Sequence, residues 1–131
     1  MGSCFSTNKS SSLTTLSNPY LNQIHEITKE EDFEKIINEI QNSNILILCD
    51  FYAVWCFPCR QIAPYLHQWA LNEYKNDVIF LKIDADQNEI LSKRLSIRTL
   101  PTFMFFKQGK EIERFSGANS TFLKAQIDKH K

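Results

Sequence analysis

A pair of cysteines constrains this chain more than any other feature of its sequence. Cys56 and Cys59 directly follow residues 45–52, a nearly continuous apolar run that predicts a central strand buried on both faces. Apolar residues at helical spacing come next and predict a helix with a kink at Pro64; they are Ile62, Leu66, Trp69 and Ala70. The cysteine pair is therefore expected where a buried strand turns into a helix.

The start of a helix gives the two cysteines different chemistry. The unpaired N–H groups and the positive end of the helix dipole favour a thiolate at Cys56, and a thiolate is the nucleophile in disulfide exchange. Cys59 lies one turn further along, where it can resolve a mixed disulfide before the substrate leaves. Pro58 suits the first helical turn, where its missing N–H costs nothing.

A Cys-x-x-Cys pair also occurs in zinc sites, which require a second pair of ligands. The other cysteines, Cys4 and Cys49, and the three histidines show no such spacing. Cys49 is expected to be a small buried core thiol. We therefore favour redox chemistry over zinc binding and predict no metal site.

The rest of the chain alternates between strand and helix patterns. A short strand is expected at residues 24–27, followed by a helix that begins with a capping box of Thr28 and Glu31. Further expected elements are a strand at 78–83, a short helix at 90–95, a hairpin of strands 103–106 and 112–115, and a last helix capped by Ser120. The order βαβαβαββα predicts an α/β fold with a central mixed β-sheet flanked by helices.

Composition limits the classes of function. The 15 Lys and Arg residues balance the 15 Asp and Glu residues, so no electrostatic feature favours nucleic acid as a partner. No apolar run approaches the roughly 20 residues that span a bilayer, and the N-terminus lacks the pattern of a secretory signal. We therefore expect a cytoplasmic protein, in a reducing compartment that suits a redox cysteine pair.

The N-terminal segment differs in composition from the rest. Residues 1–20 are rich in Ser, Thr and Asn, and Lys9 is their only charge, so a flexible tail is expected before a folded domain at 21–131. Gly2, Cys4 and Ser6 together match an N-myristoylation pattern with a cysteine placed for palmitoylation. The sequence thus predicts peripheral membrane attachment through an acylated N-terminus. The alternative is a disordered start or a cloning remnant.

Several motifs resemble those of the thioredoxin family, and they occur in the family's order. They cover about residues 22–131, and they are residues 50–59, 62–64, 82–84, 97–102, 106–109 and 117–118. The first of them contains the centre Trp55-Cys56-Phe57-Pro58-Cys59. The resemblance implies the thioredoxin fold and the activity of a protein disulfide reductase.

The same resemblance implies roles in the reaction for four residues. Cys56 would attack the target disulfide, and Cys59 would resolve the product, so that the two form a redox disulfide. Asp50 matches a buried acid that helps to deprotonate Cys59 through water, and burial is expected to raise its pKa. Lys82 matches a lysine that pairs with this acid.

Further matching residues are expected to bind the substrate. Pro101 matches a proline with a cis peptide bond, which would orient the backbone of Leu100 for strand-like pairing with a substrate. The resemblance implies that five other residues line the same groove: Trp55, Phe57, Pro58, Gly117 and Ala118.

One residue of the centre departs from the family pattern. The family usually has Gly between the first cysteine and the proline, where this chain has Phe57. Because the two intervening residues influence thiolate stability, Phe57 is expected to alter the redox potential. Its bulky ring beside the nucleophile would also restrict or select substrates.

These features predict a monomeric protein disulfide reductase that maintains redox homeostasis without a bound cofactor. The resemblance implies that a thioredoxin reductase resets it with electrons from NADPH, and that its substrates are disulfide-containing proteins. An oxidase or isomerase of the same fold is one alternative, disfavoured by the lack of a secretory signal. A non-catalytic binding or scaffold module is another, disfavoured by the intact Cys56, Cys59, Asp50 and Pro101.

Overall fold

The computed structural model describes residues 18–131, in which five strands form one sheet in the order β2-β4-β3-β5-β6. The strands are β2 (Ile24–Ile27), β3 (Leu46–Tyr52), β4 (Val78–Asp84), β5 (Thr102–Lys107) and β6 (Lys110–Ser116). β4 runs parallel to both β2 and β3, whereas β5 runs antiparallel to β3 and β6. The predicted mixed sheet and the element order βαβαβαββα are therefore confirmed.

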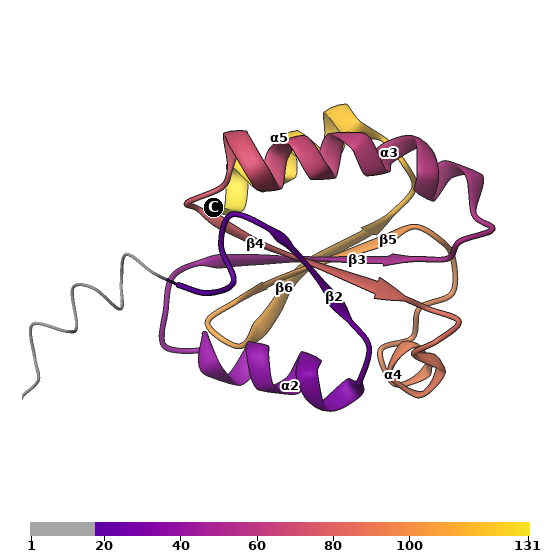
Figure 1. Ribbon diagram of the computed structural model, residues 1–131, viewed down its shortest axis with the longest axis horizontal. Coiled ribbons are helices and arrows are strands. Elements are labelled where there is room, and N and C mark those ends of the chain that lie inside the picture. The colour runs from indigo at the N-terminus through magenta and orange to yellow at the C-terminus, as the bar shows by residue number, and fades with distance from the viewer. Residues whose placement is uncertain (1–17) are drawn as a thin grey trace, which may run out of the picture.

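Helices cover both faces of the sheet (Figure 1). They are α2 (Glu30–Glu39), α3 (Phe57–Gln68), α4 (Glu89–Arg94) and α5 (Ser120–His130). α2 and α4 lie on one face, and α3 and α5 lie on the other. α3 runs through Pro64 and continues into η1 (Trp69–Glu73), a π-helical turn that the sequence pattern did not predict.

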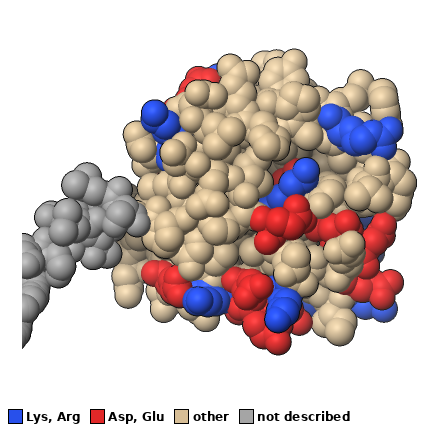
Figure 2. Space-filling view, viewed as in Figure 1, with Lys and Arg blue, Asp and Glu red and all other residues tan. Residues whose placement is uncertain are grey.

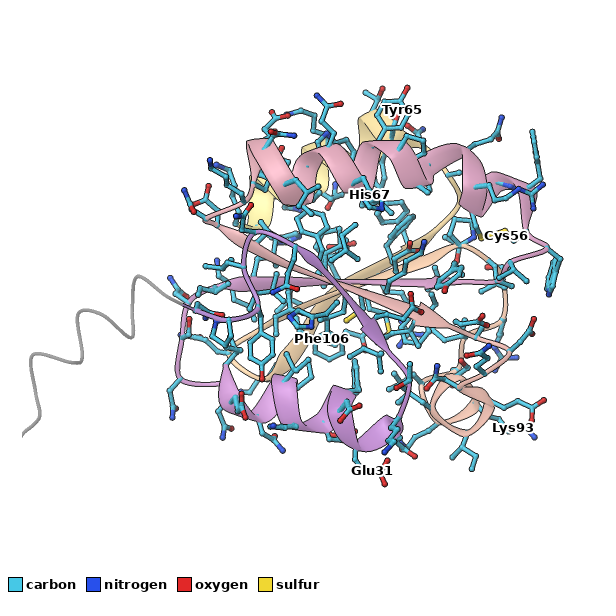
Figure 3. All side chains as sticks on the ribbon, viewed as in Figure 1. Glu31, Cys56, Tyr65, His67, Lys93 and Phe106 are labelled. Carbon is cyan, nitrogen blue, oxygen red and sulfur yellow. A yellow bond between two sulfur atoms is a disulfide. The ribbon has the colours of Figure 1, made fainter. Side chains whose placement is uncertain are left out.

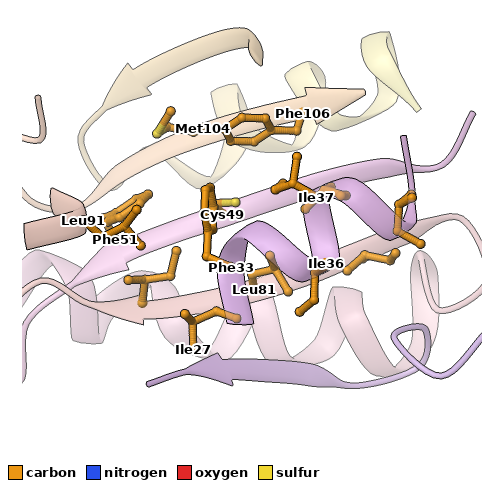
Figure 4. Packing of buried hydrophobic residues seen from close by; sticks show 14 residues of the cluster. Ile27, Phe33, Ile36, Ile37, Cys49, Phe51, Leu81, Leu91, Met104 and Phe106 are labelled. Carbon is orange, nitrogen blue, oxygen red and sulfur yellow. The ribbon is translucent and has the colours of Figure 1, made fainter. Parts of the chain in front are cut away.

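Each face of the sheet has its own hydrophobic cluster, because side chains alternate along each strand. On one face, Cys49 and Phe51 of β3 pack with Phe33 of α2 (Figure 4). On the other face, Leu48 of β3 packs with α3 and α5. Cys49 is fully buried, as predicted, and burial raises the pKa of its thiol. Asp50, its neighbour, consequently points to the α3 side.

Charged side chains gather along the side of the molecule where α2 and α4 lie (Figure 2). Arg94 of α4 forms ion pairs with two carboxylates of α2, those of Glu30 and Glu34. These contacts join the two helices that cover this face. The area over α3 shows few charges in the same view.

The β5–β6 hairpin forms one edge of the sheet, with β6 as the edge strand. β6 carries four charged side chains, Lys110, Glu111, Glu113 and Arg114, and Arg114 Nε donates to Glu111 Oε2 at 2.8 Å. The register between the two strands shifts at residues 105–106 of β5, which marks a β-bulge or a similar irregularity.

Two predicted helix caps are wrong. Lys29, not Thr28, is the N-cap of α2, and its side chain makes no cap hydrogen bond; three acidic residues in the first turn interact favourably with the helix dipole instead. α5 begins at Ser120, and its cap is Asn119, whose side chain accepts a hydrogen bond from the Phe122 N–H at 2.9 Å. Because Asn is at least as favourable as Ser at the N-cap, the helix begins one residue earlier, with Asn119 as its cap.

The first residues that the structure describes contact the folded part of the chain. Tyr20 packs against the cluster on the α2 side, and its hydroxyl donates to Glu39 Oε1 at 2.6 Å. Residue 20 therefore belongs to the folded domain. The rest of the predicted tail, with Gly2 and Cys4, lies outside the described residues. Within residues 18–131, no helix has both the length and the apolar content needed to cross a membrane.

Candidate active site

Cys56 lies where β3 gives way to α3, at the start of the helix (Figure 3). It is the N-cap of α3, and its Sγ accepts a hydrogen bond from the Cys59 N–H at 3.2 Å. The two cysteines form a disulfide, with their Cα atoms 5.3 Å apart, which is in the usual range. In the reduced protein, the same N–H and the helix dipole would favour a thiolate at Cys56.

The disulfide is buried beneath an exposed apolar rim. Cys56 and Cys59 are 4% and 5% exposed, whereas Val54, Trp55 and Phe57 are 68%, 66% and 60% exposed. These three exposed side chains, which neighbour Cys56 in the chain, therefore present an apolar surface beside the buried sulfur atoms.

Two polar residues that the sequence analysis missed hold this rim in place. Asp86 Oδ2 accepts a hydrogen bond from Trp55 Nε1 at 2.7 Å. The Arg60 guanidinium lies 5.6 Å from the centre of the Phe57 ring, and its Nη1 donates to the Val54 carbonyl at 2.9 Å. Parallel strands could have suggested Asp86, since the residues that follow β3 and β4 meet at one edge of the sheet.

The loop before β5 approaches the disulfide from the other side. The Leu100–Pro101 peptide bond is cis, as the resemblance implied, and Leu100 packs against the cluster of Ala53, Cys56 and Cys59. The Gly117 N–H donates to the Pro101 carbonyl at 2.9 Å, which brings residues 117–118 beside this loop. Gly117 has a φ of +106°, a conformation that side chains other than glycine rarely adopt.

A groove next to this loop extends the site. It has a volume of about 580 Å³, and Trp55 and Leu100 both line it. Trp55, Phe57 and Pro58 adjoin the cysteines at the start of α3, Leu100 packs against them, and Gly117 bonds to the neighbouring Pro101. Ala118 packs against the hydrophobic cluster on the α3 side of the sheet.

Asp50 lies in the second half of β3, on the side of the sheet that α3 covers, and is only 5% exposed. Burial raises the pKa of its carboxyl to about 7, an effect that the charge of Lys82 opposes and the charge of Glu26 reinforces. Among residues 18–131, no group hydrogen-bonds to Asp50 Oδ1. Asp50 borders a cavity of about 10 Å³, close to the space that one water molecule needs.

The implied pairing of Lys82 with Asp50 is only partly present. The two residues are partners in the parallel register of β3 and β4, so their charges interact. However, in the described part of the chain, the Lys82 ammonium makes no close ion pair with Asp50. It lies over the ring of Tyr52 instead, with Nζ 4.4 Å from the ring centre.

Lys82 connects the surroundings of Asp50 with those of Cys59. It lines the cavity next to Asp50, together with His67 of α3. It also lines a recess of about 200 Å³ that Cys59 and Tyr52 border. The buried acid and the second cysteine therefore both open onto space that the Lys82 side chain borders.

A disulfide at the N-terminus of a helix, between cysteines two residues apart, is the chemistry of thiol–disulfide oxidoreductases. Within the described residues, no cluster of three or more His, Cys, Asp or Glu side chains could hold a metal ion. The geometry of the site is thus that of a thiol–disulfide oxidoreductase.

Comparisons with known proteins identify the family. The family model described as Thioredoxin matches residues 23–129. Thioredoxin H2 of Arabidopsis thaliana is 44% identical over 92 residues, which are 70% of this chain and 68% of that protein. The thioredoxin of Oryctolagus cuniculus is 34% identical over 105 residues, 80% of this chain and 96% of that one.

A solved structure agrees with these matches. The thioredoxin of Fasciola hepatica superposes with a TM-score of 0.73 at 47% identity, over 82% of this chain and 99% of that chain. The chain belongs to the thioredoxin family. It is a thiol–disulfide oxidoreductase whose Cys56/Cys59 pair performs dithiol–disulfide exchange, a reaction for which thioredoxins need no bound cofactor.

Proposed function

We propose that the protein works as a reductase of protein disulfides, as a monomer in the cytoplasm, and that a thioredoxin reductase restores its dithiol with electrons from NADPH. The observation that carries this proposal is the Cys56–Cys59 disulfide at the start of α3, beside Leu100 of the cis-proline loop. This arrangement places a reactive sulfur next to backbone that a substrate can pair with.

In the first step, the Cys56 thiolate attacks one sulfur of the target disulfide. A Cys56–target disulfide forms, the target S–S bond breaks, and the second target sulfur leaves as a thiolate that takes up a proton. The rim residues Trp55 and Phe57 would contact the target here. The backbone of Leu100 would align it in an extended conformation.

In the second step, Cys59 resolves the mixed disulfide. Asp50 accepts the Cys59 proton, directly or through a water molecule, and the resulting thiolate attacks Cys56 Sγ. The Cys56–Cys59 disulfide forms as the Cys56–target bond breaks, and the second target sulfur leaves as a thiolate that takes up a proton. The target is then a dithiol that has gained two electrons. A carboxyl group with a pKa of about 7 suits this task, because it can accept and return a proton near neutral pH.

A coupled assay tests the proposal. NADPH, a thioredoxin reductase and insulin are mixed with the purified chain, and NADPH oxidation is followed together with insulin precipitation. We expect NADPH consumption that requires both the chain and insulin. A chain that dithiothreitol reduces normally, but that supports no NADPH-dependent insulin reduction, would contradict the reductase assignment and favour an oxidase or isomerase.

We further propose that Gly2 is myristoylated and Cys4 palmitoylated, so that part of the protein is held at a membrane. A single myristoyl chain gives only marginal binding, with an association constant of about 10⁴ M⁻¹, so stable attachment needs a second signal. Lys9 alone offers too little positive charge to supply it, since each basic residue contributes only about 1 kcal/mol. A palmitoyl chain on Cys4 would suffice.

Gly2→Ala is therefore expected to make the protein fully soluble, and Cys4→Ser to leave loose, reversible binding. Ser3→Ala, which keeps the acylation pattern, serves as the control and should fractionate like the native chain. All three variants should reduce insulin at the native rate, because the changes lie outside residues 23–129, which the family model matches. Cell fractionation and mass spectrometry decide the matter. A native chain that is entirely soluble, with Gly2 unacylated, would end this part of the proposal.

Phe57→Gly is expected to lower the redox potential toward about −270 mV, the value ascribed to thioredoxin in general. The Phe57 ring holds the Arg60 cation one turn from Cys56, where positive charge stabilises the thiolate and so makes the pair more oxidising. Equilibration with glutathione measures the potential, and Tyr65→Ala, an exposed aromatic change in the same helix, is the control. Equal potentials for the native chain and Phe57→Gly would refute the tuning role.

A further inference from the structure

Three charged residues form a row across the sheet, on the face that α3 covers. Register pairs Glu26 of β2 with Lys82 of β4, and Lys82 with Asp50 of β3. These three strands are neighbours in the sheet (Figure 1). Lys82 therefore has a carboxylate residue on each side, the buried Asp50 and the exposed Glu26 of the edge strand.

Tyr52 contacts two residues of this row, Glu26 and Lys82. It lies two residues after Asp50 on the same face of β3, and its hydroxyl donates to Glu26 Oε2 at 2.8 Å. Its ring lies under the Lys82 ammonium at 4.4 Å, within the range of a cation–π contact. Burial and the Glu26 carboxylate raise the pKa of the Tyr52 hydroxyl, which therefore remains a donor.

Asp50, at one end of the row, is the proposed acceptor of the Cys59 proton. Lys82 borders both the cavity next to Asp50 and the recess next to Cys59. The other charged or titratable groups on this side are Cys59, Arg60 and His67 of α3 and Asp84, the register partner of Tyr52, while β5 presents the apolar Phe103 opposite Asp50. The two charged residues of the row, Lys82 and Glu26, are the ones whose charges shift the pKa of Asp50.

We propose that Glu26 and Tyr52 are positioning residues of the redox centre: the Tyr52 hydroxyl holds the Glu26 carboxylate at the end of this row, where its negative charge sets the pH at which Asp50 accepts the proton of Cys59. This inference rests on the proposed role of Asp50 as the base in the resolving step. Tyr52 packs against the cluster of Ala53, Cys56 and Cys59, but its hydroxyl acts through Glu26, and Glu26 acts through its charge.

The direction of the effect follows from charge. The negative charge of Glu26 disfavours a second negative charge on Asp50, so its removal lowers the pKa of Asp50. Two strand spacings separate the two residues by about 10 Å. At effective dielectric constants between about 80 and 20, this distance corresponds to a change of about 0.3 to 1.2 pH units.

The experiment measures the resolving step alone. A mixed disulfide between Cys56 and a chromophoric thiol is prepared, and the release of that thiol is followed as a function of pH. We expect the rising limb of the native profile near pH 7 and a shift to lower pH by about 0.3 to 1.2 units in Glu26→Gln. Glu31→Gln, an exposed change on α2 on the opposite face, is the control and should not shift the limb. An unmoved limb in Glu26→Gln, or one at higher pH, overturns the inference.

Tyr52→Phe tests whether the hydroxyl works through Glu26. Without its hydrogen bond the exposed Glu26 carboxylate is free to turn into water, so a smaller shift in the same direction is expected. Glu26→Gln combined with Tyr52→Phe should then shift the limb no further than Glu26→Gln alone. Additive shifts would show that Tyr52 acts independently of Glu26 and would overturn this part.

Asp50→Asn distinguishes a failure of the proposed mechanism from a failure of the positioning role. If the limb near pH 7 persists in Asp50→Asn, Asp50 is not the base and the proposed mechanism fails. If the limb disappears in Asp50→Asn but stays in place in Glu26→Gln, the mechanism stands and only the positioning role is refuted.

Discussion

Cys56→Ser is expected to abolish disulfide reduction, and Cys59→Ser is expected to accumulate covalent complexes with target proteins. The first change removes the nucleophile, and no other described thiol can replace it, because Cys49 is fully buried on the opposite face of the sheet. The second change leaves the attacking thiolate intact but removes the thiol that resolves the mixed disulfide. Insulin reduction measures the loss of turnover, and non-reducing electrophoresis of lysate measures the trapped complexes.

Cys4→Ser is the matched control for both variants, since it removes a thiol outside residues 23–129, which the family model matches, and should leave turnover unchanged. The assignment of the two roles depends on which variant captures targets. Capture by Cys56→Ser, with none by Cys59→Ser, would show that Cys59 is the attacking residue.

Asp50→Asn is expected to stabilise the fold at neutral pH and above while slowing the resolving step. The pKa of Asp50 rises from 3.8 to about 7 on folding, so the native state favours the protonated acid. Its contribution to stability is complete below about pH 3.8 and is lost as the pH rises through about 7. Above that pH, the buried carboxylate lowers the unfolding free energy by a value on the order of 4 kcal/mol.

Denaturant unfolding of the native chain should therefore show lower stability at about pH 8 than at about pH 5, whereas Asp50→Asn should lose most of this difference. Asp77→Asn, an exposed acid, should keep the native pH dependence. The resolving rate is measured on the same samples. An Asp50→Asn protein that is less stable than the native chain and resolves equally fast would contradict both expectations.

The cysteine centre and the order of the elements could be predicted because their signals are local. The apolar run of β3, the spacing of Cys56 and Cys59 and the helical periodicity after them lie within one stretch of chain. A buried strand, a helix start and a thiolate follow from these patterns by short-range physics. The fold class then followed from the alternation of strands and helices.

The supporting contacts of the site could not be predicted, because they depend on register between distant segments. Glu26 and Tyr52 are 26 positions apart, and Trp55 and Asp86 are 31 apart, yet each pair is joined by a hydrogen bond. Only the parallel pairing of β2, β4 and β3 brings the first pair together. The cap of α2 failed for a different reason: Thr28 and Glu31 have the right spacing, but the helix begins one residue later, after Lys29.

The two edges of the sheet influence where a foreign polypeptide can attach. β2 has only four residues, and β6 carries four charges and an irregular register, and such edges resist the addition of another strand. An extended target segment therefore gains little by lengthening the sheet from outside. Under the proposed function, the backbone of Leu100 next to the disulfide is then where an extended target segment pairs. The sheet edges thus leave the end of the molecule that carries the disulfide as the place for such pairing.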